Sequence, residues 1–174
     1  MQNFEKYHPI MSRHYTLDWL TAFKLKEIYA LRRELDVAEA QQRPVDADIT
    51  VSAHFVNRAM ALVMGNQALL YGIRSRQEDT LLATFGFYGF STDRQCATVQ
   101  MVNAAAADDA VLEEVLPRML GFAVHELGFS SLVAGQIVRP EHEQLYLDNH
   151  FERRSDGRLV LRAAAIMDDK KYDF

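Results

Sequence analysis

The stretch between residues 111 and 154 constrains the fold most, because it reads as helix, strand, helix and strand with few residues left over. Its first part repeats apolar residues four and eight positions apart in two neighbouring rows, as in a helix that faces a core: Val111, Leu112, Val115, Leu116, Met119, Leu120, Ala123 and Leu127. We expect Gly128 to end this helix. Residues 132–138 mix β-branched and small side chains, are too few for a helix and are closed by Pro140, so they predict a buried strand.

A short helix over residues 141–149 and a hairpin are expected to follow. Leu145, Tyr146 and Leu147 lie on this helix, and Phe151 opens the next strand. An Asp-Gly turn at residues 155–157 then leads into a strand over residues 159–164. Because a helix between two strands normally makes a right-handed crossover, the strand at 132–138 should lie parallel to the strand before the first helix.

The first hundred residues predict two helices followed by strands. Thr21 can cap a helix that ends before Pro44, and Thr50 or Ser52 can cap a second that ends at Gly65. The strand candidates are residues 68–73, 80–90 and 95–102, with a weaker one at residues 15–20. This order excludes a doubly wound sheet, in which strands and helices alternate along the chain. It favours a single α+β domain over residues 1–174, with helices flanking the sheet.

Composition narrows the class of protein. With 49% apolar residues and no apolar run near the ~18 residues of a membrane span, the chain is expected to be globular and not a membrane protein. The single cysteine, Cys96, excludes an internal disulfide and favours the cytoplasm. Domains that bind nucleic acids ordinarily have more basic than acidic residues. The net charge of −5 therefore argues against a nucleic-acid partner.

Three segments carry a resemblance to the GCN5-related N-acetyltransferase superfamily, and within it to the branch of ribosomal-protein N-terminal acetyltransferases. They are the helix end at residues 122–129, the pair Leu145-Tyr146, and His150-Phe151 where that superfamily usually has Gly-Phe. The resemblance extends over about residues 15–162. It implies a mixed, mostly antiparallel sheet that splays between its fourth and fifth strands, acetyl-CoA as cosubstrate, and an amine of a small molecule or protein N-terminus as acceptor. A homodimer is compatible with it.

The resemblance also implies site residues. Tyr146 matches a tyrosine whose phenol donates a proton to the departing thiolate, although a tyrosine on such a helix can also serve packing alone. Main-chain groups of Met101, Val102 and Asn103 match the strand along which the pantetheine arm lies. Arg139 stands where an asparagine often precedes the tyrosine by seven residues, and its cation could reach a phosphate or a substrate carboxylate.

The expected pyrophosphate loop departs from the superfamily pattern. The usual basic residue and glycines fall on residues 107–112, which hold neither, so the matching cofactor-binding positions are Asp109, Ala110, Val111 and Leu112. Asp108 and Asp109 place carboxylates where a pyrophosphate would lie, or they simply cap the helix. Pro117 adds an alternative, since the helix could kink there or begin only near Leu116.

A general base is not evident from the sequence. Thr98 occupies the position where glutamate is common and cannot serve, which leaves a water relay or the side chains Glu39, His54, His125 and His142. The histidines lack the spacing of a metal site, so no metal is expected. Gly86 suggests a close approach in the aromatic strand, and an outward Tyr88 could border a substrate cleft. The competing interpretations are a non-catalytic module of the same fold and an unrelated α+β interaction domain.

Overall fold

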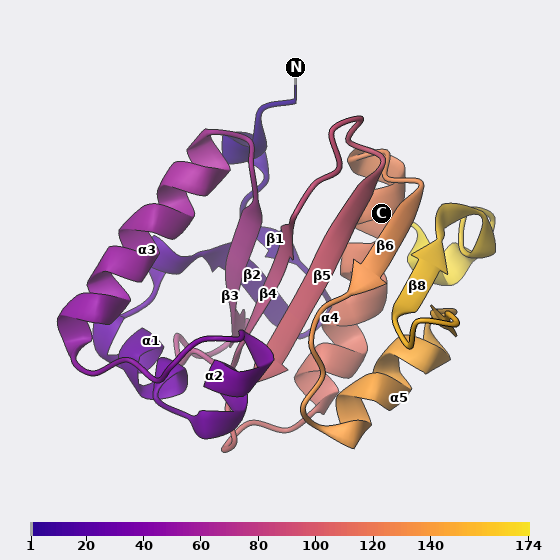
Figure 1. Ribbon diagram of the computed structural model, residues 1–174. Coiled ribbons are helices and arrows are strands. Elements are labelled where there is room, and N and C mark those ends of the chain that lie inside the picture. Colours follow the sequence, from indigo (N-terminus) through magenta and orange to yellow (C-terminus); the bar gives the residue numbers. More distant parts are fainter. Residues whose placement is uncertain (1) are drawn as a thin grey trace.

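The computed structural model describes residues 2–174, which are built around an eight-stranded mixed sheet (Figure 1). The strand order is β1-β2-β3-β4-β5-β6-β8-β7, and among these described strands only β5 and β6 are parallel neighbours. This confirms the predicted α+β class and the crossover between residues 95 and 134. The strands are β1 Ile10–Met11, β2 Tyr15–Trp19, β3 Leu69–Ser75, β4 Ala83–Tyr88, β5 Cys96–Asn103, β6 Ser131–Ala134, β7 Glu152–Arg153 and β8 Leu159–Arg162.

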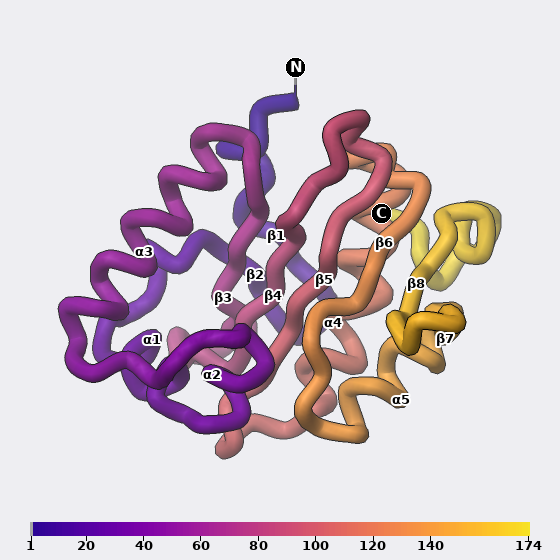
Figure 2. The backbone as a smooth tube through the Cα atoms, in the orientation of Figure 1, coloured from indigo at the N-terminus to yellow at the C-terminus, as the bar shows by residue number. Residues whose placement is uncertain are grey.

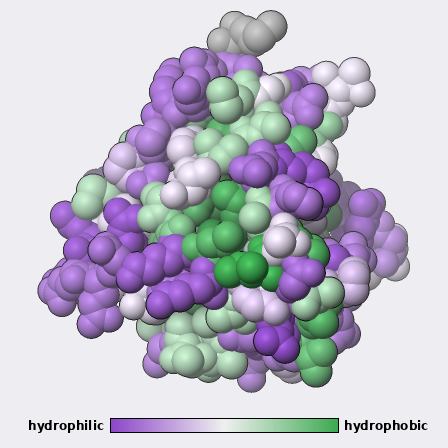
Figure 3. All heavy atoms as spheres, turned by 90° about the vertical axis from the view of Figure 1, so that its left-hand side faces the viewer, coloured by the Kyte–Doolittle hydropathy of each residue, from purple (hydrophilic) through white to green (hydrophobic). Residues whose placement is uncertain are grey.

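Helices cover both faces of the sheet. In Figure 1, α4 lies behind the strands, whereas α3 forms the left-hand side with α1 and α2 below it. The helices are α1 Leu25–Arg32, α2 Leu35–Ala40, α3 Ile49–Met64, α4 Ala110–Gly121 and α5 Pro140–Asp148. Figure 3 views the side that carries α3, where hydrophobic residues gather near the middle and hydrophilic ones surround them. Within residues 2–174, no helix is long and apolar enough to cross a membrane.

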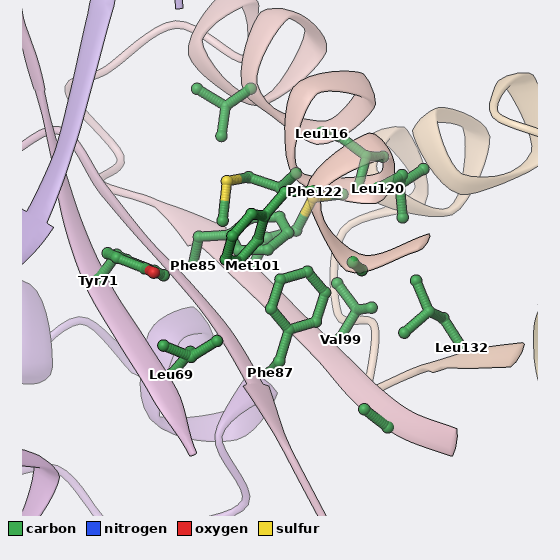
Figure 4. Close-up of a cluster of buried hydrophobic side chains, with 14 of the residues drawn as sticks. Leu69, Tyr71, Phe85, Phe87, Val99, Met101, Leu116, Leu120, Phe122 and Leu132 are labelled. Carbon is green, nitrogen blue, oxygen red and sulfur yellow. The ribbon is translucent and has the colours of Figure 1, made fainter. Parts of the chain in front are cut away.

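The hydrophobic core on the α4 side fixes which way β4 and β5 face. Phe85, Phe87, Val99 and Met101 point toward α4, and each is at most 3% exposed (Figure 4). Side chains alternate between the faces of a strand, so Thr98 and Gln100 project to the opposite face, toward α1–α3. This alternation gives β4 and β5 an apolar face over Phe85, Phe87, Val99 and Met101, and an opposite face on which the polar side chain of Gln100 is buried.

The first predicted helix is broken in the structure. Thr21 lies in a short 3₁₀ turn, and the chain is helical only from Leu25 to Arg32 and again from Leu35 to Ala40. Glu34 between them is extended, with φ −67° and ψ 131°. The break lets Val37 and Ala38 become buried, whereas Leu35 is exposed. Tertiary packing of α2 therefore overrides the helical pattern of the segment.

The second predicted helix is confirmed, but another residue caps it. Asp48, and neither Thr50 nor Ser52, is the cap, because its carboxylate accepts a hydrogen bond from the Thr50 amide at 2.8 Å. Ser52 is fully buried inside the helix, and its hydroxyl donates to Asp46 Oδ2 at 2.6 Å. Asp46 thus becomes a buried anchor for this part of the chain.

Helix α4 runs through Pro117 without ending, so the alternative start near Leu116 is wrong. A proline inside a helix costs about 3 kcal/mol. Full burial of a large apolar side chain contributes about 1.5–3 kcal/mol, and α4 buries six of them, so packing outweighs the proline. They are Val111, Leu112, Val115, Leu116, Met119 and Leu120. A π-helical turn, Phe122–Glu126, follows before the chain ends its helix at Gly128 with a φ of +77°.

The close contact between α4 and the C-terminal segment supports a prediction. We expect Gly121→Ala to lower the free energy of unfolding by about 1–3 kcal/mol, because its Cβ would lie 2.1 Å from the main-chain oxygen of Tyr172. Tyr172 cannot easily retreat, since it is buried and its hydroxyl donates to Asn149. Denaturant unfolding measures the change. Gly128→Asn is the control, because its Cβ meets open space and asparagine tolerates the positive φ of +77° better than other side chains; equal losses in the two variants would contradict the steric explanation.

Candidate functional site

Strands β5 and β6 separate part-way along (Figures 1 and 2), and residues that follow this point on both segments line a cleft. Their parallel pairing ends at Val99 opposite Ala134, and the last hydrogen bond runs from the Gly135 amide to the Val99 oxygen at 2.7 Å. Residues 135–138, predicted to continue the strand, instead turn away toward α5, so the predicted strand is four residues too long. The cleft is so narrow that no water-sized sphere fits into it in this structure, and Met101 and Ile137 are among the residues that line it.

The main chain of β5 beyond Val99 provides unpaired polar groups along this cleft. Alternate residues of a strand direct their N–H and C=O groups to the same side. Because the Val99 oxygen points toward β6, the main-chain groups of Met101 and Asn103 also point toward the cleft. Val102 turns its main chain toward β4, where it pairs with Thr84, but it remains among the residues that line the cleft.

Tyr146 lies at the closed end of the cleft. Its hydroxyl donates to the Val99 oxygen at 3.4 Å, and its ring packs edge-on against Phe151 with the centroids 4.9 Å apart. Burial, with a smaller contribution from Tyr88, raises the pKa of Tyr146 above its ordinary value. The phenol therefore stays protonated at neutral pH, a state in which it can donate a proton but cannot act as a base.

A polar cluster, formed by Asp36, Asn103, Asp109, Arg139 and His142, closes the other end of the cleft. Asn103 Oδ1 accepts from Arg139 Nη1 at 3.0 Å and contacts His142 Nε2 at 2.9 Å, and its Nδ2 donates to Asp109 Oδ1 at 2.8 Å. Arg139 also reaches Asp36 Oδ2 at 3.1 Å. The cluster therefore joins α2, the end of β5 and the starts of α4 and α5.

Burial lowers the pKa of His142, the one histidine in the polar cluster, and the neighbouring Asp109 only partly offsets this effect. A neutral imidazole could accept a proton. However, its Nε2 already faces Asn103, and the residue is 4% exposed. The side chains of the other candidate bases, Glu39, His54 and His125, are exposed, although the main chain of Glu39 lies beside the cleft residue Gln136. Among residues 2–174, no three metal-ligating side chains lie close enough to hold a metal ion.

The predicted phosphate-binding positions lie where α4 begins, and their first amides have partners. Asp108 Oδ1 accepts from the Ala110 amide at 2.9 Å, so Asp108 caps the helix. The Leu112 amide donates to the main-chain oxygen of Asp109 at 2.9 Å. The side chains of Val111 and Leu112 belong to the core. The Asp109 carboxylate projects instead into the polar cluster, which the sequence analysis did not foresee.

A second cavity, which we call the Gln100 pocket, opens on the face of the sheet opposite α4. Its volume is about 330 Å³, and Gln100 and Tyr88 line it together with residues of α1 and α3. Gly86 pairs with Gln100 across the strands. A Cβ at Gly86 would lie 2.8 Å from a methyl carbon of Leu70, which confirms the close approach expected there. Tyr88 is partly exposed and borders this cavity, in keeping with the expectation for it.

Comparison with known proteins identifies the fold. No family model and no curated sequence matches the chain. A Vibrio cholerae protein assigned as a ribosomal-protein-serine acetyltransferase superposes with a TM-score of 0.73 at 17% identity, over 88% of this chain and 97% of its own. RimL, a ribosomal L7/L12 α-N-protein acetyltransferase solved with coenzyme A, gives 0.70 at 10% identity over 88% and 96%.

A third structure extends the comparison to a bound acyl donor. The microcin C7 self-immunity acetyltransferase MccE, solved with acetyl-CoA and AMP, superposes with a TM-score of 0.67 at 12% identity, over 85% of this chain and 91% of its own. At these identities the likeness concerns the fold. The parting of β5 and β6, which are the strands predicted as fourth and fifth because β1 was not predicted, agrees with the implied splay, and the chain therefore has the fold of the GCN5-related N-acetyltransferases.

Proposed function

We propose that the chain is an acyl-CoA-dependent N-acetyltransferase that moves an acetyl group directly to a primary amine of a small molecule or a peptide N-terminus. The observation that carries the proposal is the β5–β6 cleft with the protonated hydroxyl of Tyr146 at its closed end. Acetyl transfer leaves a thiolate that must be protonated, and a buried phenol supplies that proton. Structural neighbours solved with coenzyme A or acetyl-CoA support the choice of cosubstrate.

In the proposed mechanism the chain orients both reactants and moves one proton. The open main-chain groups of Met101 and Asn103 hold the thioester arm by hydrogen bonds, as a neighbouring strand would. The amine attacks the thioester carbonyl in its neutral form, the C–S bond then breaks, and Tyr146 donates its proton to the departing sulfur. The nitrogen, now bonded to the acetyl carbon, loses a proton to water, and this proton returns through water to the Tyr146 oxygen and regenerates the phenol. Arg139, at the mouth of the cleft, is proposed to contact a phosphate of the cosubstrate after its bond to Asn103 opens.

The start of α4 fits the cosubstrate less well than the cleft does. Asp109 holds a carboxylate beside the proposed pyrophosphate position, and the Ala110 amide is already bonded to Asp108. These two features favour the second candidate, a non-catalytic module of this fold that binds a ligand or a protein partner. Binding of acetyl-CoA is required of the enzyme but is also compatible with a binding module. Release of the thiol in the presence of an amine is expected of the enzyme alone.

Removing the Asp109 charge is expected to tighten acetyl-CoA binding. Asp109→Asn keeps an oxygen that accepts from Asn103 and deletes a like charge next to the phosphates, so the dissociation constant should fall about three- to tenfold at low salt. Asp108 is left intact because it caps α4. Calorimetry gives the constant, with the exposed Asp168→Asn as control. Unchanged or weaker binding would mean that the pyrophosphate lies elsewhere.

The proposed function is tested by a calorimetric titration with acetyl-CoA, followed by a thiol-release assay on a panel of amines. We expect saturable binding and amine-dependent release of coenzyme A. A ligand that binds only the folded state also raises the apparent stability, so a thermal shift provides an independent measure. Binding without thiol release on any amine would favour the non-catalytic module, and absence of both would reject the proposal.

A further inference from the structure

The Gln100 pocket contains a buried amide that lacks a partner. Gln100 is 9% exposed, and within residues 2–174 neither its Oε1 nor its Nε2 makes a hydrogen bond. Buried polar groups are nearly always hydrogen-bonded, and one left unpaired costs free energy. The pocket is large enough for an organic molecule, and a rotation of the Gln100 side chain would expose its covered amide to that molecule, so the unpaired amide points to a ligand.

The same amide lies close to the point where the strands part. A Cβ placed on Gly135 would lie 2.3 Å from Gln100 Oε1 and 3.2 Å from the Tyr88 hydroxyl. The Gly135 amide is bonded to the Val99 oxygen, which also accepts from Tyr146. The Gln100 pocket therefore reaches the closed end of the β5–β6 cleft from the opposite face of the sheet, where an acceptor amine would have to enter.

Positive charge gathers around this pocket although the chain as a whole carries −5. Three arginines line it, Arg32, Arg43 and Arg58, and its lining contains no carboxylate among the described residues. The nearby Asp46 pairs with Arg32 through bonds of 2.5 and 3.0 Å and lies 3.6 Å from Arg43 Nη1. One carboxylate thus faces two guanidinium groups, of which that of Arg32 is buried and that of Arg43 partly buried.

Two of these arginines retain unused hydrogen-bonding capacity. Arg43 Nη2 is buried and makes no hydrogen bond within the described chain. Burial and the neighbouring Arg32 lower the pKa of Arg43 to about 10, which still leaves it protonated at neutral pH. Arg58 is exposed at the rim and forms no ion pair with any residue between 2 and 174. Guanidinium groups bind carboxylates and phosphates through paired N–H donors.

We propose that the Gln100 pocket binds the acceptor, and that the acceptor is a primary amine carrying an anionic group, either a carboxylate or a phosphate. This inference rests on the proposed function and specifies its substrate class. Arg58 and Arg43 contact the anion, Gln100 hydrogen-bonds a polar group between the anion and the amine, and the amine points toward Gly135. Cationic polyamines are excluded by repulsion from the same arginines.

Matched acceptors test this substrate class. The thiol-release assay compares O-phosphoethanolamine with ethanolamine, and the tripeptide amide Ser-Glu-Phe with Ser-Gln-Phe, with spermidine as the cationic member. We expect the anionic member of one pair to have a kcat/KM at least about tenfold above its neutral partner, and spermidine to be the poorest substrate. The pair that discriminates identifies the anion as phosphate or carboxylate. Equal rates within both pairs, or a preference for spermidine, would overturn the proposal.

Two variants connect the preference to the pocket. Arg58→Ala should raise KM for the anionic acceptor about tenfold with kcat nearly unchanged, and Arg58→Lys should recover part of the loss, whereas the exposed Arg13→Ala should change neither constant. Gln100→Met should weaken acceptor binding without lowering the stability of the free protein, because the amide has no partner to lose. An unchanged KM in Arg58→Ala, or a destabilised Gln100→Met, would contradict the assignment.

Binding of the acceptor, measured in the absence of acetyl-CoA, distinguishes a failure of this inference from a failure of the proposed function. In one outcome, acetyl-CoA neither binds nor reacts, yet phosphoethanolamine or the acidic peptide stabilises the wild type and not Arg58→Ala. This result would support anion binding in the Gln100 pocket and reject the enzymatic function. If acetyl-CoA is consumed equally with neutral, cationic and anionic amines, the function stands and the anion pocket fails.

Discussion

Tyr146→Phe is expected to lower turnover about 10²- to 10⁴-fold while acetyl-CoA affinity changes little, because only the proton donor is removed. Phenylalanine preserves the packing against Phe151, and the lost hydrogen bond to Val99 is long at 3.4 Å. Steady-state kinetics and calorimetry on the same preparations separate the two quantities. The raised pKa of Tyr146 adds a pH signature: no loss of rate from deprotonation of this acid is expected between about pH 7 and 9.

A matched tyrosine controls for the general effect of losing a hydroxyl. Tyr29 lies on α1, partly exposed, with no hydrogen bond from its hydroxyl among those of the described residues, so Tyr29→Phe should leave turnover unchanged. A wild-type rate in Tyr146→Phe would show that Tyr146 serves packing alone. That result would also leave the non-catalytic module as the better explanation of the cleft.

Asp46→Ala is expected to lower the free energy of unfolding by about 3–5 kcal/mol, the usual cost of removing one partner of a buried ion pair. Asp46 is 3% exposed and accepts hydrogen bonds from Arg32 and Ser52, so its loss leaves buried guanidinium groups uncompensated. Denaturant unfolding at neutral pH gives the change. Asp168→Ala, at an exposed position, is the control and should change stability by less than about 0.5 kcal/mol.

The same pair predicts a pH dependence. Burial raises the pKa of Asp46, but the hydrogen bonds from Arg32 and Ser52 and the charges of Arg32 and Arg43 outweigh it, so the net shift is downward. A depressed pKa in the folded state means that the stabilisation is present above the unfolded pKa of 3.8 and is lost as the pH falls through the folded value. In Asp46→Ala this contribution to acid sensitivity should be absent, and an unchanged acid-unfolding curve would contradict it.

The features that the sequence predicted are those encoded locally. The apolar rows of α4, the Asp156-Gly157 turn and the Leu145-Tyr146 helix depend on spacing within one segment, and each was placed correctly. The break after Arg32 was missed because its cause is distant: α2 packs on the sheet, and Arg32 pairs with Asp46. The two-residue strand β1 was missed because so short a segment has no periodicity to recognise.

In the candidate site, too, a feature encoded within one segment was predicted and contacts between distant segments were not. Tyr146 was placed by a local pair of residues, whereas the contacts of Asn103 with Arg139 and His142 join positions 36 and 39 residues apart. No single-segment pattern reports such contacts. Gln100 escaped notice for a different reason, since a lone polar residue in a strand resembles an ordinary solvent-facing one. Only the helices packed over that face make it a buried, unpaired amide.

The parting of β5 and β6 gives the sheet an additional edge inside the molecule. Edge strands with free N–H and C=O groups can recruit a strand from another chain, which is a route to aggregation. Here Arg139 bonds to Asn103, and Gln136 donates to the main-chain oxygen of Glu39 at 3.3 Å, so α2 and the chain before α5 screen this edge. The cluster that narrows the cleft therefore also protects the protein against edge-to-edge association with its own copies.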